Sequence, residues 1–221
     1  MAQYGFYFNS NRCTGCRTCT MACKDFNDLS QIVAFRKVYD YEGGTTVESN
    51  GEVTTTCYAY HVSEACNHCD SPACVANCPQ ASMQKDPETG LVYNDPETCI
   101  GCGTCATSCP YGVPTIDTEA KKSVKCDGCR ERVAAGKAPI CVEACPLRAL
   151  EFDEIEALRA AHPGCDADIA PLADPAITGP NLIVDKCSVA QSATAGQGFV
   201  GNQNEIDGVA ARELFNEYSI A

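Results

Sequence analysis

Short stretches of alternating apolar and polar residues are spread along the chain, and they predict small strands and turns rather than long helices. Residues 35–41 alternate and end at a glycine pair, which favours a strand. Residues 53–62 are rich in Thr, Tyr and Val, and we expect them to pair with that strand as a hairpin. Shorter strands are predicted at residues 90–94 and 181–185. Together these segments predict an α+β fold.

The C-terminal part of the chain has a different pattern. Residues 154–162 read as a helix that Pro163 and Gly164 stop. Residues 188–208 are rich in Ser, Ala, Gly, Gln and Asn, which favours an extended arm, and residues 209–218 are predicted to form a short helix. An arm of this composition has little to pack on within its own domain. Two interpretations therefore stay open, docking on a partner protein and a frayed terminus.

The composition adds an unusual amount of cysteine to this picture. The chain has 19 cysteines among 221 residues, no Trp, 7 Phe and 3 Met. Cysteine at this density is typical of a disulfide scaffold or of metal ligation. So few bulky apolar residues would make a thin core. Inorganic clusters could fill that core, and their binding would contribute folding free energy.

Charge and hydropathy exclude several classes of function. The formal net charge is −13, and no Lys/Arg-rich stretch is long enough to follow a phosphate backbone, so we expect no nucleic-acid partner. No run of 18 or more apolar residues exists, which predicts no membrane span. The first residues lack a basic segment followed by an apolar one, so no signal peptide is predicted. Work at a membrane would require an anchor on another subunit.

Sixteen of the cysteines form four groups with similar spacing. Group I consists of Cys13, Cys16, Cys19 and Cys23. Group II consists of Cys66, Cys69, Cys74 and Cys78. Group III consists of Cys99, Cys102, Cys105 and Cys109. Group IV consists of Cys126, Cys129, Cys141 and Cys145. A proline directly follows the fourth cysteine in groups II, III and IV, and the whole pattern is an irregular internal repeat.

This spacing is typical of iron–sulfur ligation. Three closely spaced cysteines can wrap three corners of a cubic cluster, whereas the fourth lies too far round the turn and binds a neighbouring cluster in two-cluster ferredoxins. Gly15 and Gly101 lie in these loops, where we expect the missing Cβ to let the backbone approach the cluster. Zinc sites and disulfides, the alternatives, do not require such triplets. The sequence therefore predicts four 4Fe–4S clusters held by sixteen thiolates.

The grouping also predicts how the clusters are shared. Groups II and III are near neighbours in sequence and favour one ferredoxin-like unit. Its clusters would be held by Cys66, Cys69, Cys74 and Cys109, and by Cys78, Cys99, Cys102 and Cys105. Groups I and IV would then pair across this insert. Their clusters would be held by Cys13, Cys16, Cys19 and Cys145, and by Cys23, Cys126, Cys129 and Cys141. Sequential pairing of group I with II and of III with IV is the alternative.

The shared clusters imply a nested arrangement of two bacterial-ferredoxin-like units. The outer unit is predicted at residues 1–65 and 111–150, and the inner unit at residues 66–110. Residues 151–221 would form a C-terminal extension, which we expect to dock on a partner.

Several residues near the groups are expected to have lesser roles. Cys57, Cys165 and Cys187 belong to no group and are interpreted as small apolar residues or free thiols. His68 lies between two ligands, but each cluster already has four thiolates, so we expect it to tune a cluster rather than to bind it. The cations that flank ligands are Arg12, Arg17, Lys24 and Lys125. A positive charge there would raise a cluster's potential, but we expect a solvated role for each of them.

The motifs extend beyond the ligands themselves. They include Cys-Thr-Gly-Cys-Arg-Thr-Cys at Cys13, Cys-Asn-His-Cys at Cys66, Cys-Pro-Tyr-Gly at Cys109, Lys-Cys-Asp-Gly-Cys at Lys125 and Cys-Val-Glu-Ala-Cys-Pro-Leu-Arg-Ala-Leu at Cys141. On these residues the chain resembles the four-cluster iron–sulfur subunit of membrane-associated molybdopterin oxidoreductases. It is most similar to the electron-transfer subunit of anaerobic dimethyl sulfoxide reductase. Polysulfide, tetrathionate and nitrite reductases and some formate dehydrogenases use similar subunits.

The resemblance implies a non-catalytic electron-transfer subunit in anaerobic respiration. Electrons would come from an integral membrane anchor subunit that oxidises quinol, pass the group II and III clusters and then the group I and IV clusters, and reach a molybdopterin catalytic subunit. In some relatives a residue other than cysteine at the position of Cys102 gives a three-iron cluster, so the cysteine here implies four 4Fe–4S clusters.

The resemblance also bears on location. It implies that the subunit is membrane-associated through its partners, either on the cytoplasmic face or in the periplasm after export with the catalytic subunit. The alternative hypotheses are a free-standing polyferredoxin and a zinc-binding structural protein.

Overall fold

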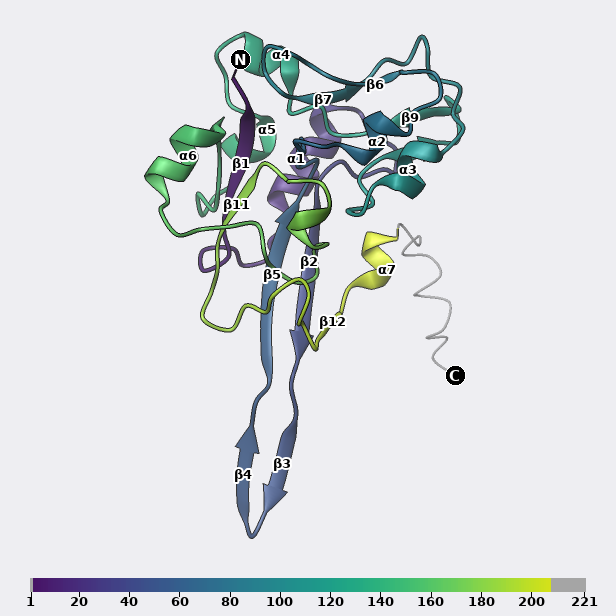
Figure 1. Cartoon of the computed structure of the whole chain (residues 1–221). Helices are drawn as coiled ribbons and strands as arrows, with labels where there is room; N and C mark the ends of the chain where they lie inside the picture. Colours follow the sequence, from purple (N-terminus) through teal and green to yellow (C-terminus); the bar gives the residue numbers. More distant parts are fainter. Residues whose placement is uncertain (1, 208–221) are drawn as a thin grey trace.

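The structure is a computed structural model that describes residues 2–207, and it has a mixed α+β fold of small sheets and short helices. Most elements gather in one body, and a long two-stranded ribbon projects from it (Figure 1). The ribbon consists of β3 (Thr46–Ser49) and β4 (Glu52–Thr55). The α+β class expected from the sequence is therefore confirmed.

An antiparallel strand pair joins each cysteine group to the next. Between groups I and II, β2 (Lys37–Gly43) pairs with β5 (Tyr58–Glu64). Between groups II and III, β6 (Met83–Lys85) pairs with β7 (Val92–Asn94). Between groups III and IV, β8 (Thr115–Asp117) pairs with β9 (Lys122–Val124). The strand predicted at residues 90–94 is thus confirmed as β7.

The fourth strand pair closes this circuit. β10 (Leu150–Glu154) follows group IV and pairs antiparallel with β1 (Tyr4–Asn9), which precedes group I. On its other edge β1 pairs in parallel with β11 (Leu182–Asp185), which confirms the strand predicted at residues 181–185. Groups I and IV, far apart in sequence, therefore leave the same small sheet.

The helices are short, and most of them carry or adjoin cysteines. They are α1 (Thr18–Phe26), α2 (Ala73–Ala76), α3 (Thr104–Ser108), α4 (Arg130–Ala134) and α5 (Ile140–Glu143). Helix α1 contacts α5, and α2 contacts α3. These contacts place group I beside group IV and group II beside group III. None of the helices that the structure describes combines the length and the apolar character needed to cross a membrane.

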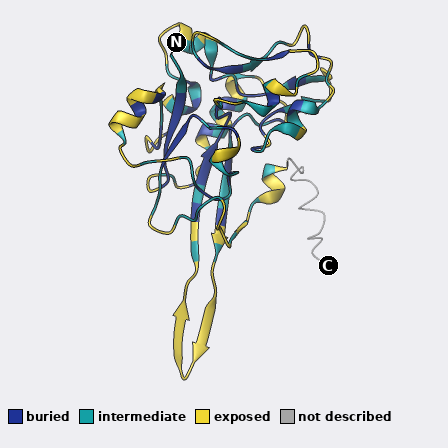
Figure 2. Ribbon diagram, viewed as in Figure 1, coloured by how far each residue is buried: buried dark blue, intermediate teal, exposed yellow. Residues whose placement is uncertain are grey.

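The predicted hairpin is confirmed. β2 and β5 pair with Tyr41 opposite Tyr60, and β2 ends at Gly43, as the glycine pair predicts. The chain continues into β3 and β4 and turns at Asn50 and Gly51, which both have positive φ. An Asn-Gly pair is strongly preferred in such two-residue turns. All eight residues of β3 and β4 are exposed (Figure 2).

The C-terminal extension contributes to the body of the fold. The helix predicted at residues 154–162 is confirmed as α6 (Ile155–Ala161), which contacts β1, β10 and β11. A single 3-10 turn (Pro175–Ile177) precedes β11. Since β10 and β11 both flank β1, the chain up to residue 185 belongs to the sheet from which the first cysteine group leaves.

Residues 188–207 pack on their own chain, which corrects the expectation that this arm has little to pack on. β12 (Phe199–Val200) pairs with the free edge of β2, and α7 (Gln203–Ile206) follows it. The amide of Asn202 accepts from Asp40 N at 2.9 Å and donates to Val38 O at 2.8 Å. A strand edge binds through backbone groups, so a segment poor in apolar side chains can dock there. The helix predicted at residues 209–218 lies outside the described residues.

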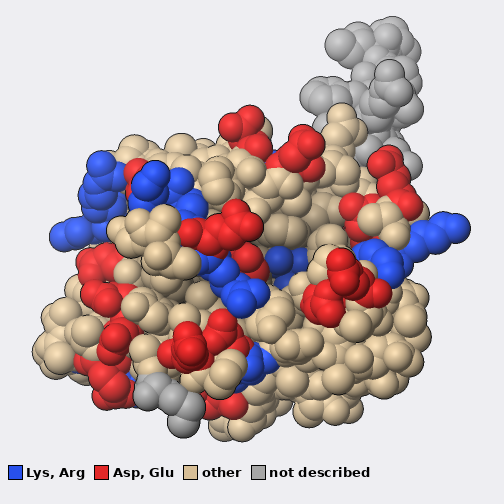
Figure 3. All heavy atoms as spheres, turned by 90° about the horizontal axis from the view of Figure 1, so that it is seen from above, with Lys and Arg blue, Asp and Glu red and all other residues tan. Residues whose placement is uncertain are grey.

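The buried core contains many of the cysteines, and Figure 2 shows that the buried segments gather in the body and not in the projecting ribbon. Its bulky members include Phe6, Phe8 and Met83. On the face seen from above in Figure 3, Lys and Arg side chains are interspersed with Asp and Glu side chains.

Candidate metal centres

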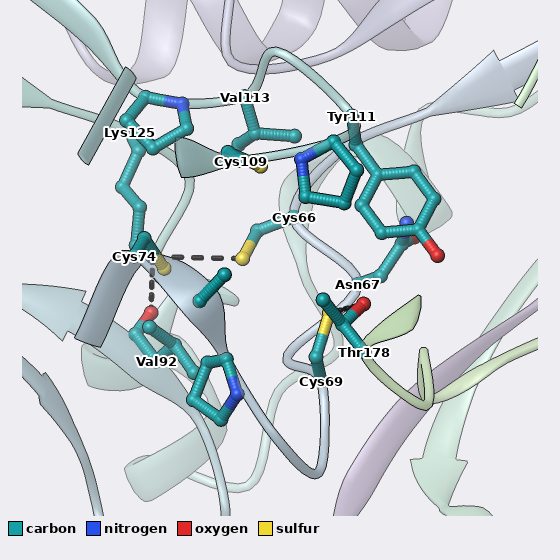
Figure 4. Close-up of a pocket in the computed structure, with 14 residues that line it drawn as sticks. Cys66, Asn67, Cys69, Cys74, Val92, Cys109, Tyr111, Val113, Lys125 and Thr178 are labelled. Atoms are coloured by element: carbon teal, nitrogen blue, oxygen red, sulfur yellow. Dashed lines mark hydrogen bonds between the residues drawn. The ribbon is translucent and has the colours of Figure 1, made fainter. Parts of the chain in front are cut away.

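Cysteines from different groups face one another around cavities. Site A is lined by Cys13, Cys16, Cys19 and Cys145. Site C is lined by Cys66, Cys69, Cys74 and Cys109 (Figure 4). Site D is lined by Cys78, Cys99, Cys102 and Cys105. Each cavity combines three cysteines of one group with the fourth cysteine of another.

A fourth set of thiols lies close enough together for its members to act on one another's pKa. Site B consists of Cys23, Cys126, Cys129 and Cys141. Burial raises the pKa of the Cys23 thiol, and the thiolates of Cys126 and Cys141 raise it further. Burial, together with the same two neighbours, raises the pKa of the Cys129 thiol to about 12. The four sets are those of the nested scheme, and their role as cluster ligands stays a prediction.

Helical geometry explains why the fourth cysteine of a group serves another site. Cys19 and Cys23 lie on α1, four residues apart and therefore on the same face, displaced by about 6 Å along the axis. Cys19 faces site A, and Cys23 faces site B. At α5 the earlier cysteine serves site B and the later one serves site A. Cys141 belongs to site B, and Cys145, just beyond the helix, lines site A.

Backbone N–H groups point at several of the sulfurs. Gly128 N lies 3.4 Å from Cys126 Sγ, and Ala149 N lies 3.3 Å from Cys145 Sγ. Gly101 N lies 3.5 Å from Cys99 Sγ, and its φ is +68°. A Cβ at this position would collide with the carbonyl oxygen of Lys121. The close approach that requires glycine here is therefore to a neighbouring backbone segment, whereas the sequence pattern predicts an approach to the cluster.

Hydroxyl groups also lie next to the sulfurs, and sequence reasoning missed them. The Oγ–Sγ distances are 3.4 Å for Ser63–Cys19, 3.1 Å for Ser123–Cys105 and 3.2 Å for Ser82–Cys78. The corresponding distances are 3.4 Å for Thr18–Cys16, 3.3 Å for Thr104–Cys102 and 3.2 Å for Thr178–Cys69. The spacing carried a signal, because a serine stands three residues before both group II and group IV.

The donor sets fit iron–sulfur clusters better than single ions. Across residues 2–207, no three His, Cys, Asp or Glu side chains converge so that they could share one metal ion. The thiols surround cavities instead. Burial raises the pKa of Cys13 to about 11 and that of Cys74 to about 12. Such thiols become thiolates only beside a strong positive charge, which cluster iron supplies.

The cations that flank ligands differ in their surroundings. Arg12 is exposed, and Arg17 forms a partly exposed ion pair with Asp40. Lys24 Nζ donates to the carbonyl oxygens of Ser30 and Val33. The expectation of a solvated role is wrong for one member of the set, because Lys125 is only 5% exposed.

His68 is fully buried and is not among the residues that line site C. Its Nδ1 accepts from Val92 N at 2.9 Å, so the neutral ring carries its proton on Nε2. Burial lowers the pKa of His68. The Nε2 atom faces the loop of group IV at Gly128. His68 thus lies between groups II and IV.

The three remaining cysteines do not line sites A, C or D. Cys165 and Cys187 are partly buried and pack against apolar core residues, as expected. Cys57 is exposed at the base of the projecting ribbon, so its interpretation as a small apolar residue is wrong and that as a free thiol holds.

Comparisons with known proteins agree with the chemistry of these sites. Residues 57–155 match the 4Fe–4S dicluster domain, and residues 4–25 match a 4Fe–4S binding domain. The chain is 48% identical, over 92% of its length and 98% of the relative, to the probable anaerobic dimethyl sulfoxide reductase chain YnfG of Escherichia coli. It is 46% identical, over 93% of its length and 100% of the relative, to an anaerobic dimethyl sulfoxide reductase chain of Haemophilus influenzae.

A more distant relative has another name. Protein NrfC of Escherichia coli is 35% identical over 70% of this chain and 66% of that protein. The likeness to dimethyl sulfoxide reductase chains covers nearly the whole sequence, whereas that to NrfC covers about two thirds of it. The protein therefore belongs to the family of iron–sulfur electron-transfer subunits that includes those of anaerobic dimethyl sulfoxide reductase.

Proposed function

We propose that this chain holds four 4Fe–4S clusters, one at each of sites A to D, in two nested ferredoxin-like units. The outer unit, residues 1–65 and 111–150, contains sites A and B, and the inner unit, residues 66–110, contains sites C and D. The observation that carries the proposal is the exchange of fourth cysteines. Cys109 lines site C with group II, and Cys78 lines site D with group III.

The sites follow one another in the order A, B, C, D. Helices α1 and α5 contact each other and supply cysteines to both A and B, and α2 and α3 relate C and D in the same way. Lys125 lies between B and C, since its Nζ is 3.6 Å from Cys66 Sγ and 2.6 Å from Cys126 O. When bound, the clusters supply one-electron transfer.

The ends of this order are the places where electrons enter and leave. Site A includes the exposed Cys16, and site D includes the exposed Cys102. The cysteines of sites B and C are all buried or partly buried. A partner docked over either end would come close to a cluster, whereas the middle sites are reached only through the chain.

The relatives suggest which partners dock there. They are chains of anaerobic dimethyl sulfoxide reductase, so this chain serves as the non-catalytic relay of a similar complex. An integral membrane anchor subunit that oxidises quinol delivers electrons at site D, and a molybdopterin catalytic subunit receives them at site A. The chain is then membrane-associated through these partners.

The intact complex provides the test. Purified with its partners, it should contain about sixteen iron atoms and as many acid-labile sulfides per copy of this chain, after subtraction of any cluster in the catalytic subunit. About twelve iron atoms would reject the four-cluster proposal, and zinc without sulfide would reject the whole assignment. A chain isolated as a stable monomer without a molybdopterin or membrane partner would support the polyferredoxin alternative.

A further inference from the structure

Sites B and C pose an electrostatic problem for a relay. A 4Fe–4S cluster with four thiolates becomes more negative when it takes up an electron, and burial in a medium of low polarity disfavours the more highly charged form. Sites A and D each include an exposed cysteine, but sites B and C do not. Burial therefore opposes reduction most strongly in the middle of the relay.

Arg36 is a buried cation beside site B. Its side chain is 2% exposed. Nη1 donates to the carbonyl and hydroxyl oxygens of Ser63, both at 3.2 Å, and the guanidinium lies 4.6 Å from the centre of the Phe6 ring. No sequence motif marks this residue, which directly precedes β2 between groups I and II.

Two N–H groups of Arg36 lack a protein partner. Nε and Nη2 form no hydrogen bond with any other described residue. The buried carboxyl group of Glu64 is near enough for the charge of Arg36 to act on its pKa, but burial outweighs this effect and raises that pKa to about 8. Burial acts to lower the pKa of Arg36, but the thiolates of Cys141, Cys19 and Cys126 outweigh it and raise the pKa. Cys141 and Cys126 belong to site B, and Cys19 of site A lies 3.4 Å from the Ser63 hydroxyl group that Arg36 binds, so the charge lies where sites A and B meet.

Lys125 is the corresponding cation beside site C. Its Nζ donates to the carbonyl oxygens of Val92 and Cys126 and lies 3.6 Å from Cys66 Sγ (Figure 4). Within residues 2–207, Lys125 forms no ion pair with a carboxylate. Like Arg36, it is a buried charge beside cysteines of the proposed clusters.

The two buried cations come from different positions in the chain. The residue directly before the first cysteine is Arg12 in group I, Ala65 in group II, Thr98 in group III and Lys125 in group IV, and of the two cations among them Lys125 is buried and Arg12 exposed. Arg36 directly precedes β2, which lies between groups I and II. Each inner site has thus gained one buried cation from an unrelated position, which points to a requirement of the sites themselves.

We propose that Arg36 and Lys125 are positioning residues that raise the reduction potentials of the clusters at sites B and C, respectively. Each buried charge stabilises the reduced cluster and offsets the cost of reducing it away from water. The step is the uptake of one electron from the neighbouring cluster, with no bond made or broken. This inference rests on the four-cluster function proposed above.

The test is a potentiometric titration of the intact complex, followed by electron paramagnetic resonance. The variants are Arg36→Met and Lys125→Met, and Cys141→Ser and Cys74→Ser assign the signals of sites B and C. At a fixed ambient potential, we expect the oxidised-to-reduced ratio to rise at least tenfold at site B in R36M and at site C in K125M. Tenfold corresponds to about 59 mV for one electron. Arg36→Lys and Lys125→Arg keep the positive charge, so the oxidised-to-reduced ratio should stay close to the wild-type value at sites B and C.

Two further variants control for structure and for charge at the surface. Arg12→Gln removes an exposed cation next to a ligand and should leave every potential unchanged within threefold. If the Met variants lose iron, Arg36→Gln and Lys125→Gln decide, because they keep N–H donors and remove only the charge. Wild-type ratios at sites B and C in iron-replete Met or Gln variants would overturn the inference. Four clusters in the wild type alongside that result would leave the proposed function intact.

Discussion

The hydroxyl oxygen of Ser123 lies 3.1 Å from the sulfur of Cys105 in site D. Ser63 repeats this relationship at site A, where its hydroxyl oxygen lies 3.4 Å from Cys19 Sγ. Each serine is the next-to-last residue of the second strand of a hairpin that follows one cysteine group, and it stands three residues before the next group. Both hairpins thus return a buried hydroxyl group to the third cysteine of the group they left.

Loss of this hydroxyl should lower the potential of the cluster at site D. A hydrogen bond to a thiolate stabilises the more negative, reduced cluster, and a bond of this kind contributes roughly 1 kcal/mol. In Ser123→Ala we expect the oxidised-to-reduced ratio at site D to rise about fivefold in a potentiometric titration. Ser108→Ala is the control, because its hydroxyl donates to Thr104 O and to no sulfur. Equal shifts in both variants would contradict this explanation.

The docked arm at residues 188–207 should depend on Asn202. Its amide makes two hydrogen bonds to the backbone of β2, and their loss should weaken local docking by roughly 1–3 kcal/mol. In Asn202→Ala we expect faster hydrogen exchange and faster limited proteolysis within the arm. The exposed Gln203 provides the control, since its side-chain amide donates to Asp207 within the same turn. Wild-type protection in N202A would show that other contacts hold the arm.

The projecting ribbon should be dispensable for cluster binding. Gly43 and Tyr58 are paired in register, so residues 44–57 can be replaced by Asn-Gly to close a shorter hairpin. The ribbon strands bury no core side chain, so iron content should stay at the wild-type value and unfolding free energy should change by less than about 1 kcal/mol. Loss of iron from the shortened protein would show that the ribbon supports the sites.

Removal of iron should unfold much of the body. The buried thiols of all four sites belong to or contact the core, and without clusters the cavities would leave that core without cross-links. Under strong reductant and chelator, we expect the chain to lose protease resistance together with its visible absorbance. An iron-free chain that kept wild-type resistance would show that the apolar residues alone hold the fold.

The cysteine spacing predicts the four converging sets because it acts through local geometry. Cys19 and Cys23 are one helical turn apart, so the position of one constrains the other, and the same rule applies to each group. The α+β class, the predicted hairpin, the strands at residues 90–94 and 181–185 and the helix at residues 154–162 follow from equally local patterns. The glycine pair correctly indicates where β2 ends, and the Asn-Gly pair at Asn50 is typical of the turn that joins β3 and β4.

Other features depend on contacts between distant segments. Arg36 stands 13 residues beyond its nearest ligand in sequence, Cys23, and only the packing of β2 brings it to site B. Lys125 resembles any surface lysine until β7 supplies the Val92 carbonyl that holds it. The packing of the arm depends on a similar contact, because the free edge of β2 exists only once the strands are paired.

The exchange of the fourth cysteine is the central claim, and Cys109→Ser tests it most directly. The measurement is electron paramagnetic resonance of the intact complex together with its iron content. We predict that the variant alters or loses the cluster at site C, whose other ligands come from group II, and leaves that at site D unchanged. Cys78→Ser should give the reciprocal result. A C109S variant with an altered site D cluster and an unaltered site C cluster would contradict the account.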